Sequence, residues 1–142
     1  MGRKYFLVVL FLILAMFLSG CGEVTDESKV RNVIDEYFLT VTGQDWEKAK
    51  SYCIYGSDIY YETCSFEDHI DSFYPFSVDI IFDVDIFNIT ITTGDYASAY
   101  IYGSLTITTT DDDLITSDFS EYFYLQKISN DWKLYKGELY NG

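Results

Sequence analysis

The feature that most constrains this chain is the alternation of apolar and polar residues that begins after Pro75. Apolar side chains first occupy even positions, at Val78, Ile80, Phe82, Val84 and Ile86, and then odd positions, at Phe87, Ile89 and Ile91. A period of two is the pattern of a β-strand with one buried face. A change of parity within one strand predicts a single bulged residue, here between Val84 and Ile89, and such a bulge bends the strand. The second half of the chain is therefore predicted to form a curved antiparallel sheet.

Three more strands follow the bulged strand. They are predicted over residues 96–110, 115–128 and 132–140, joined by turns at 93–95, 111–113 and 130–131. With three residues in the first turn and a bulge near Ile86, Val84 is predicted to face Leu105. The register of the last strand stays open, because either of two pairs can take the inner face: Trp132 with Leu134, or Tyr135 with Leu139.

The outer face of the predicted sheet is rich in tyrosine. A loop of three residues at 111–113 predicts that Tyr102 faces Tyr122 and that Tyr100 faces Tyr124, and aromatic pairs of this kind stabilise a sheet. Tyrosine is enriched at recognition surfaces. The candidate interaction face consists of Tyr96, Tyr100, Tyr102, Tyr122 and Tyr124. Its partner would be a second copy of the chain or another envelope protein, and the alternative is a sheet face without a partner.

The first half of the chain is predicted to be helical. Apolar residues recur at helical spacing at Val30, Val33, Ile34, Tyr37, Phe38 and Val41, which predicts one apolar face over three turns. Thr25 or Asp26 caps the start of this helix, and Gly43 follows its end, where a left-handed residue is expected.

Two shorter helices are predicted after the first. Asp45 caps one that runs from residue 46 to about residue 54. Residues 55–63 are predicted to be irregular or a short strand. The spacing of Ser65 and Asp68 resembles a capping box, which predicts that a third helix opens there.

The start of the chain carries an export signal. Arg3 and Lys4 precede an apolar run over residues 5–18 that is short for a membrane-spanning helix. The run ends in Leu18-Ser19-Gly20-Cys21, which resembles the lipobox of bacterial lipoproteins. The resemblance implies that Cys21 is diacylated through sulfur, with palmitate-type chains, and becomes the first residue of the mature chain; the alternative is an ordinary cleaved signal with a chance cysteine. The predicted organisation is a signal peptide at 1–20, a tether at 21–26 and one domain at 27–142.

Charge and cysteine content describe the mature chain further. The signal takes 2 of the 9 basic residues with it, so 7 basic and 23 acidic side chains remain, a net charge of −16. Such a surface repels phosphate backbones, so nucleic acid is not an expected partner. Cys53 and Cys64 form an even pair in an exported protein, which predicts either a disulfide or two buried thiols.

Helices followed by a bent antiparallel meander predict an α+β fold, with N-terminal helices packed on a strongly curved sheet. In this order the chain resembles the NTF2-like (cystatin-like, cone-shaped) superfamily, especially small bacterial lipoproteins with such a domain. The resemblance rests on residues 30–41, 43–49, 94–99, 124–127 and 131–135. It implies a domain related to enzymes that work inside the cone, such as ketosteroid isomerase and scytalone dehydratase, and to many members that only bind partners or dimerise.

The sequence offers no catalytic, cofactor-binding or metal-binding constellation. A cone enzyme needs a carboxylate base facing an apolar pocket, whereas Asp79, Asp83 and Asp85 alternate with apolar residues and belong to the opposite face. Tyr37 is the best hydrogen-bond donor on the inner face, with core packing as its alternative. His69 is expected to be a packed or half-exposed helix residue, with a general base as its alternative. We therefore predict a non-enzymatic binding domain, lipid-anchored on the extracytoplasmic side of the cell membrane. The alternative is a small-molecule-binding protein, of unknown ligand, or an isomerase-like or dehydratase-like enzyme that uses the cone.

Overall fold

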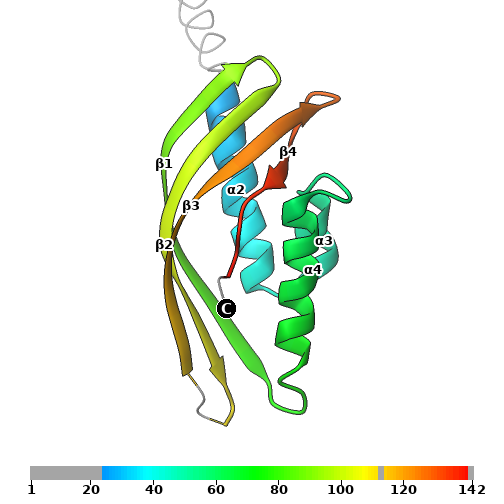
Figure 1. Ribbon diagram of the computed structural model, residues 1–142, viewed down its shortest axis with the longest axis vertical. Coiled ribbons are helices and arrows are strands. Elements are labelled where there is room, and N and C mark those ends of the chain that lie inside the picture. Colours follow the sequence, from blue (N-terminus) through cyan, green and yellow to red (C-terminus); the bar gives the residue numbers. More distant parts are fainter. Residues whose placement is uncertain (1–23, 112–113, 141–142) are drawn as a thin grey trace, which may run out of the picture.

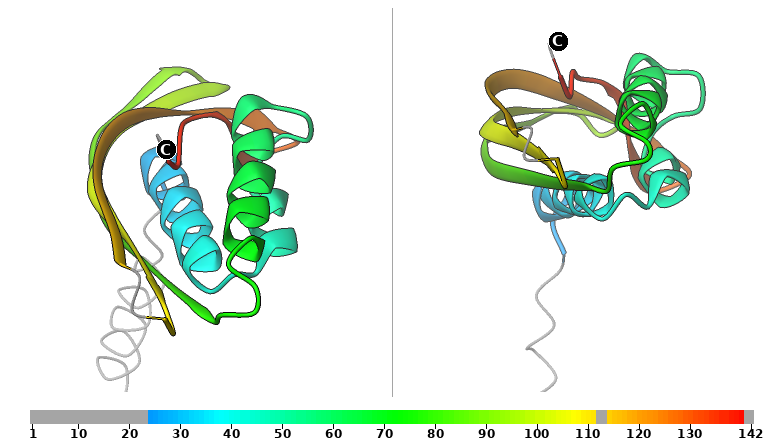
Figure 2. Two further views of the ribbon diagram at one scale, coloured as in Figure 1. Left: turned by 60° about the horizontal axis from the view of Figure 1, so that its bottom comes forward. Right: turned by 90° about the horizontal axis from the view of Figure 1, so that it is seen from below.

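The computed structural model describes residues 24–111 and 114–140, and it confirms the α+β fold. A four-stranded antiparallel sheet of order β1-β2-β3-β4 curves around a layer of helices (Figures 1 and 2). The helices are α2 (Asp26–Thr42), α3 (Trp46–Ser51) and α4 (Asp58–Asp71). The strands are β1 (Val78–Thr93), β2 (Tyr96–Thr109), β3 (Leu114–Ile128) and β4 (Asp131–Lys136).

Helix α2 has the predicted start and a different end. Thr25 is the N-cap, and its hydroxyl accepts from the amide of Ser28 at 3.2 Å. Gly43 caps the other end in a right-handed conformation, with φ −78°, so the prediction of a left-handed glycine there is wrong. The left-handed residue is Gln44, with φ 56°. Its side-chain amide donates to the Val78 carbonyl at 2.7 Å, and this bond ties the helix end to the start of β1.

Helix α4 begins earlier than the capping-box prediction at Ser65. Ser57 is the N-cap, and its hydroxyl accepts from the Tyr60 amide at 3.4 Å. The buried residues Ile59, Thr63, Phe66 and Ile70 are spaced by four, three and four, so one helical face runs through the segment predicted to be irregular. The tyrosines of this segment favour strands, but burial of Ile59 and Thr63 against the other helices outweighs that local preference.

Helix α3 is capped by Asp45, as predicted, and ends at Ser51, before the predicted residue 54. Cys53 follows it and forms an isolated parallel bridge with Leu134 of β4. The Ile54 amide donates to the Leu134 carbonyl at 2.7 Å, and the Leu134 amide donates to the Tyr52 carbonyl at 2.9 Å. The segment after α3 therefore covers the free edge of β4.

The predicted bulge is present in β1, two residues beyond the expected point. Phe87 pairs with Tyr100 and Thr90 pairs with Ser98, so Asn88 and Ile89 together oppose one residue of β2. Asn88 has φ 47°, a left-handed conformation that asparagine tolerates better than most residues. Because the parity changes after Phe87, that side chain lies on the outer face and is 49% exposed, contrary to the inward position predicted for it.

The first hairpin differs from the predicted register. Its turn is shorter, with Thr93 paired to Tyr96, and Val84 lies opposite Gly103 instead of Leu105. A Cβ atom at Gly103 would lie 2.3 Å from the Asp83 carbonyl oxygen, so only glycine permits this close approach of β1 and β2.

The register between β2 and β3 is offset by two residues from the prediction. Tyr100, not Tyr102, pairs with Tyr122, and Tyr102 pairs with Ser120. The predicted Tyr102–Tyr122 pair is therefore wrong. An offset of two leaves every side chain on its predicted face, so the alternation of apolar residues cannot distinguish the two registers.

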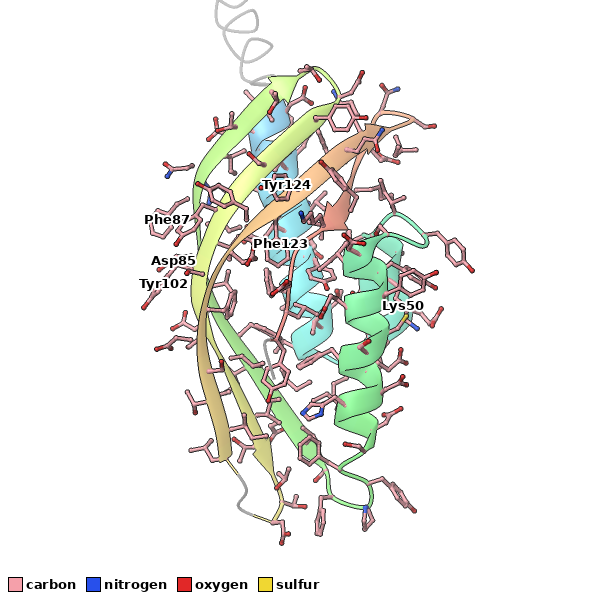
Figure 3. All side chains as sticks on the ribbon, viewed as in Figure 1. Lys50, Asp85, Phe87, Tyr102, Phe123 and Tyr124 are labelled. Carbon is pink, nitrogen blue, oxygen red and sulfur yellow. The ribbon has the colours of Figure 1, made fainter. Side chains whose placement is uncertain are left out.

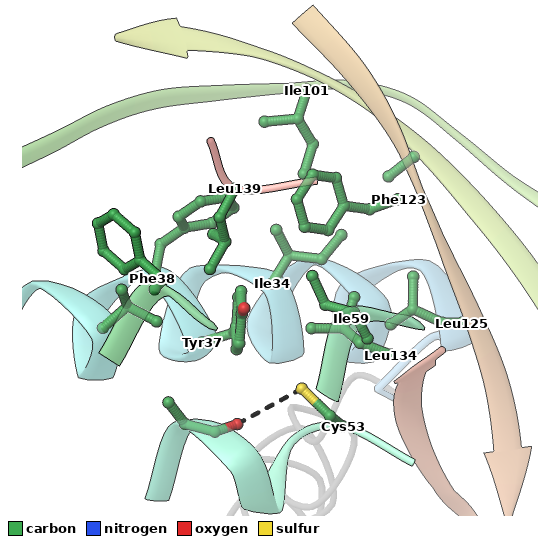
Figure 4. Close-up of a cluster of buried hydrophobic side chains, with 14 of the residues drawn as sticks. Ile34, Tyr37, Phe38, Cys53, Ile59, Ile101, Phe123, Leu125, Leu134 and Leu139 are labelled. Atoms are coloured by element: carbon green, nitrogen blue, oxygen red, sulfur yellow. Dashed lines mark hydrogen bonds between the residues drawn. The ribbon is translucent and has the colours of Figure 1, made fainter. Parts of the chain in front are cut away.

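The structure shows which residues of β4 and of the segment after it face the core. Trp132 and Leu134 are buried, and so is Leu139, which lies past the end of the strand at Lys136. Leu139 lies inside the curve of the sheet, among core residues of α2 and β3 (Figure 4). The buried core comes from residues between Val30 and Leu139. A chain that lacks residues 1–20 therefore keeps the whole of this core.

Candidate interaction face

The inside of the cone is filled by side chains of the protein itself. Tyr37, Ile101 and Phe123 have no exposed surface, and Leu139 is 1% exposed. The hydroxyl of Tyr37 lies 2.8 Å from that of Thr63, and burial raises the pKa of this tyrosine well above its ordinary value. Tyr37 is therefore a packed core residue with a bonded hydroxyl, and it presents no donor to a cavity.

Among the residues that the structure describes, no carboxylate is buried inside the cone. Within the part of the chain that the structure describes, the buried polar or charged residues are three threonines, Thr40, Thr63 and Thr109. Asp79, Asp83 and Asp85 are exposed on the outer side of β1, as predicted. Among these same residues no three His, Cys, Asp or Glu side chains come together to hold a metal ion.

His69 packs among aromatic rings, as expected for a helix residue beside the core. Its ring stacks on Tyr140 at a centroid distance of 5.5 Å and meets Phe73 edge-on at 5.2 Å. Its Nε2 atom is buried without a hydrogen-bond partner among the described residues. The stacking attaches the last described residue of the chain to α4.

The outer, convex face of the sheet carries a row of tyrosine rings, which we call the tyrosine face. Figure 3 labels two of its members, Tyr102 and Tyr124. The face consists of the five predicted residues and one more: Tyr96, Tyr100, Tyr102, Tyr122, Tyr124 and Tyr135. Five of these rings form a continuous series of contacts, with centroid distances of 6.4 Å for Tyr96–Tyr135, 6.2 Å for Tyr135–Tyr124, 6.2 Å for Tyr124–Tyr122 and 5.0 Å for Tyr122–Tyr100.

Tyr135 is the member of this face whose side the sequence left open. A register shift lies between the pairs Tyr124–Lys136 and Leu125–Leu134, so Tyr135 is an extra residue of β4. It contacts Tyr96 and Tyr124 on the outer face, where Lys136 Nζ also lies, 5.7 Å from the centre of the Tyr124 ring. Simple alternation along β4 would have placed Tyr135 and Lys136 on opposite faces.

A shallow acidic groove of about 230 Å³ lies next to the tyrosine face, over the first halves of β1 and β3. Its lining residues are Asp83, Asp85, Tyr102, Gly103, Ser104 and Asp118. Ser104 pairs with Asp83 on one side and Asp118 on the other, so two carboxylates flank it in one row across three strands. Tyr102 stands in the next row and is 52% exposed.

A larger hollow of about 450 Å³ lies outside the cone, where the start of α2 meets the β3–β4 turn. Val24, Lys29 and Tyr52 contribute to its wall together with Trp132 and Lys133. Its mixed lining includes one acidic residue, Asp131, and brings no catalytic pair together.

The two cysteines of the domain are free thiols in the structure. Cys53 is buried, and burial raises the pKa of its thiol to about 12. Its sulfur lies 3.7 Å from the Ala49 carbonyl oxygen (Figure 4). Cys64 is half-buried on α4. The structure has the two thiols unbridged, and of the two only Cys53 is buried.

The predicted anchor, Cys21, and the signal before it lie outside the described residues. No helix within residues 24–111 and 114–140 is long and apolar enough to cross a membrane.

Comparisons of sequence give no relative for this chain: no protein-family model matches it, and no curated protein matches it. Comparison of structures gives several. The intermembrane-space region of the chloroplast protein ARC6 superposes with a TM-score of 0.64 at 8% identity, over 83% of this chain and 98% of that one.

Two bacterial structures match with similar coverage. A putative dehydratase of the NTF2-like family from Streptomyces avermitilis has a TM-score of 0.64 at 14% identity, over 82% of this chain and 96% of that one. A protein of unknown function with a cystatin-like fold from Nostoc punctiforme has a TM-score of 0.53 at 13% identity, over 80% and 88%. At these identities the likeness concerns the fold alone, and the fold of this chain is the NTF2-like, cystatin-like α+β cone.

Proposed function

We propose that the mature chain is a non-enzymatic binding domain, anchored through lipid on Cys21 to the extracytoplasmic side of the cell membrane, which contacts a protein partner through its tyrosine face. The observation that carries the binding role is the contrast between the two faces of the sheet. The concave face is filled by the protein's own side chains, whereas the convex face leaves Tyr96, Tyr102 and Tyr122 each 44–52% exposed. A clustered aromatic surface of this kind is typical of a contact site.

The anchor is supported by the sequence alone. Two acyl chains hold a protein stably at a bilayer, where one is marginal. The segment from Cys21 to Asp26 spans at most about 17 Å when extended, so the domain would stay close to the lipid surface. Replacement of Cys21 by serine is expected to abolish palmitate labelling and release the chain from the membrane fraction. Unchanged processing and retention of the Cys21→Ser chain would contradict the anchor.

The contact site is tested separately by photo-cross-linking in the native envelope. A photoreactive phenylalanine analogue in place of Tyr122 is expected to give one discrete adduct. The matched control is the same analogue in place of Tyr61, an exposed tyrosine on α4 that is 61% accessible. Equal adduct yields from positions 122 and 61 would remove the tyrosine face as the binding site.

A second candidate function is that the cone binds a small molecule or works as an isomerase-like or dehydratase-like enzyme. It is favoured by the Streptomyces neighbour, which is described as a putative dehydratase. It would require Leu139 and Tyr140 to leave the cone, because both residues now pack there. The dye 1-anilinonaphthalene-8-sulfonate is expected not to bind the Cys21→Ser chain without its signal. A stoichiometric fluorescence increase would favour this second function.

A further inference from the structure

Charged side chains are distributed unevenly along the tyrosine face, with three aspartates at one end and Lys136 beside Tyr124. Its acidic end carries Asp83, Asp85 and Asp118 around one groove. Asp83 and Asp118 occupy strands two places apart, which corresponds to a separation of about 10 Å between backbones. Within the described residues the ion pairs join Lys50 to Glu47 and Glu67, and Lys127 to Asp26. None of these pairs includes a residue of the groove.

Neighbouring like charges without a partner cost stability. Exposed aromatic rings beside them add apolar surface that folding has not removed from water: Tyr102 is 52% exposed and Phe87 is 49% exposed. Such departures from a stability optimum are expected where a surface serves binding. The two features lie side by side, since Asp85 pairs with Tyr102 and Phe87 pairs with Tyr100.

A second copy of this chain fits the surface poorly. With 23 acidic side chains against 7 basic ones, the mature chain brings the same excess of negative charge to any contact with itself. Lys136, which lies on this face, already covers the Tyr124 ring. Charge complementarity therefore favours a different protein, one with basic side chains.

We propose that the tyrosine face binds a basic protein segment, with a Lys or Arg side chain seated between Asp83 and Asp118 and the adjoining residues lying along Tyr100 and Tyr122. This proposal rests on the proposed function and specifies its partner. A guanidinium group forms charge-assisted hydrogen bonds with carboxylates and stacks on aromatic rings, so the groove and Tyr102 together match arginine well.

The test is a titration of the soluble chain, Cys21→Ser without its signal, with an oligo-arginine peptide, followed by NMR and calorimetry. Amide shifts are expected to cluster at Tyr102, Ser104 and Ser120. The double variant Asp83→Asn with Asp118→Asn is expected to weaken binding at least tenfold. The matched control, Asp68→Asn with Asp71→Asn, removes the same charge from the exposed side of α4 and is expected to weaken it less than twofold.

Equal weakening by the two doubles, or shifts spread evenly over the surface, would overturn the proposal, because net charge alone would then explain binding. The groove double is expected to melt no lower than wild type, since it removes repulsion. If it does not fold, Asp85→Asn and the Tyr102→Ser variant repeat the comparison. A sedimentation experiment that gives a dimer dissociated by Tyr122→Ser would equally overturn it. If the titration overturns the basic-segment proposal but position 122 still gives a specific cross-link, the proposed function stands.

Discussion

Asp26 and Trp132 are joined by a hydrogen bond of 3.2 Å from the indole Nε1 to Oδ1, across 106 residues of chain. Lys127 Nζ lies 3.0 Å from each oxygen of the same carboxylate, and it also lies 5.2 Å from the centre of the Trp132 ring. The first turn of α2, directly after the proposed lipid tether, is thereby tied to β3 and β4. The bonds from Lys127 and then Trp132 hold the pKa of Asp26 below its ordinary value.

This cluster predicts a pH dependence of stability. Since the pKa of Asp26 is lower in the folded chain than in the unfolded one, its contribution is complete above the unfolded value of about 3.9 and is lost as pH falls through the folded value. Asp26→Asn is expected to lower the melting temperature at pH 7, and the difference from wild type is expected to shrink below about pH 4. Melting curves of the soluble chain between pH 7 and pH 3 measure it. The control is Glu27→Gln on the same helical turn; an identical pH profile for both variants would contradict the role of the cluster.

The filling of the cone by the C-terminal segment predicts a large effect at Leu139. Leu139→Ala removes a side chain that is 1% exposed and leaves a cavity, so the free energy of unfolding is expected to fall by about 2–5 kcal/mol. Leu39→Ala on α2, where the side chain is 64% exposed, is expected to change it by about 0.5 kcal/mol or less. Urea titration measures both. Equal losses would mean that the tail does not occupy the cone.

The close approach at Gly103 predicts that alanine is not tolerated there. Its Cβ would lie 2.3 Å from the Asp83 carbonyl oxygen, so the two strands must separate and the expected loss is about 1–3 kcal/mol or more. Gly94→Ala, where no atom lies within 4 Å of the new methyl group, serves as the control. Chemical denaturation of the two variants tests the register of the hairpin, because the predicted Val84–Leu105 pairing would not place Asp83 against Gly103.

The two thiols are expected to differ in reactivity. Only the thiolate is nucleophilic, and burial raises the pKa of Cys53 to about 12, so iodoacetamide is expected to modify Cys64 first and Cys53 only after denaturation. The sequence has 3 cysteines, so the Cys21→Ser chain keeps only Cys53 and Cys64. Mass spectrometry of this chain at pH 8 counts the labels. A chain that takes no label until a reductant is added would show a Cys53–Cys64 bridge instead.

Local patterns predicted most of the architecture. The spacing from Val30 to Val41 predicted α2, and the parity change after Ile86 predicted a bulge in β1, both confirmed. The pattern predicted the start of α4 wrongly, because Ser65 and Asp68 form a local capping signal and Ser57 is the residue that caps the folded helix. The true signal was the spacing of Ile59, Thr63, Phe66 and Ile70.

The residues of the tyrosine face were predicted more accurately than the strand registers that arrange them. Five of its six tyrosines were expected on the outer side, and the structure puts them there. Tyr135 was missed because the sequence left open which residues of the last strand face inward, and the outward side of Tyr135 follows once Leu134 is buried. The acidic groove was missed because it depends on which residues of β1 and β3 flank Ser104.

The sequence by itself determined most of the helical and strand segments and which face of the sheet is apolar, because periods of 3.6 and 2 are properties of one segment at a time. Residues 58–63, which belong to α4 in the structure, are the exception. The registers, the passage of Leu139 into the cone and the meeting of Asp83 with Asp118 across β2 were decided only by the tertiary structure. A register shift of two residues keeps the apolar side of a strand inward, so the alternation of apolar residues cannot distinguish the two registers. Contacts between distant segments, such as the approach of β1 to Gly103, select one register among those that alternation allows.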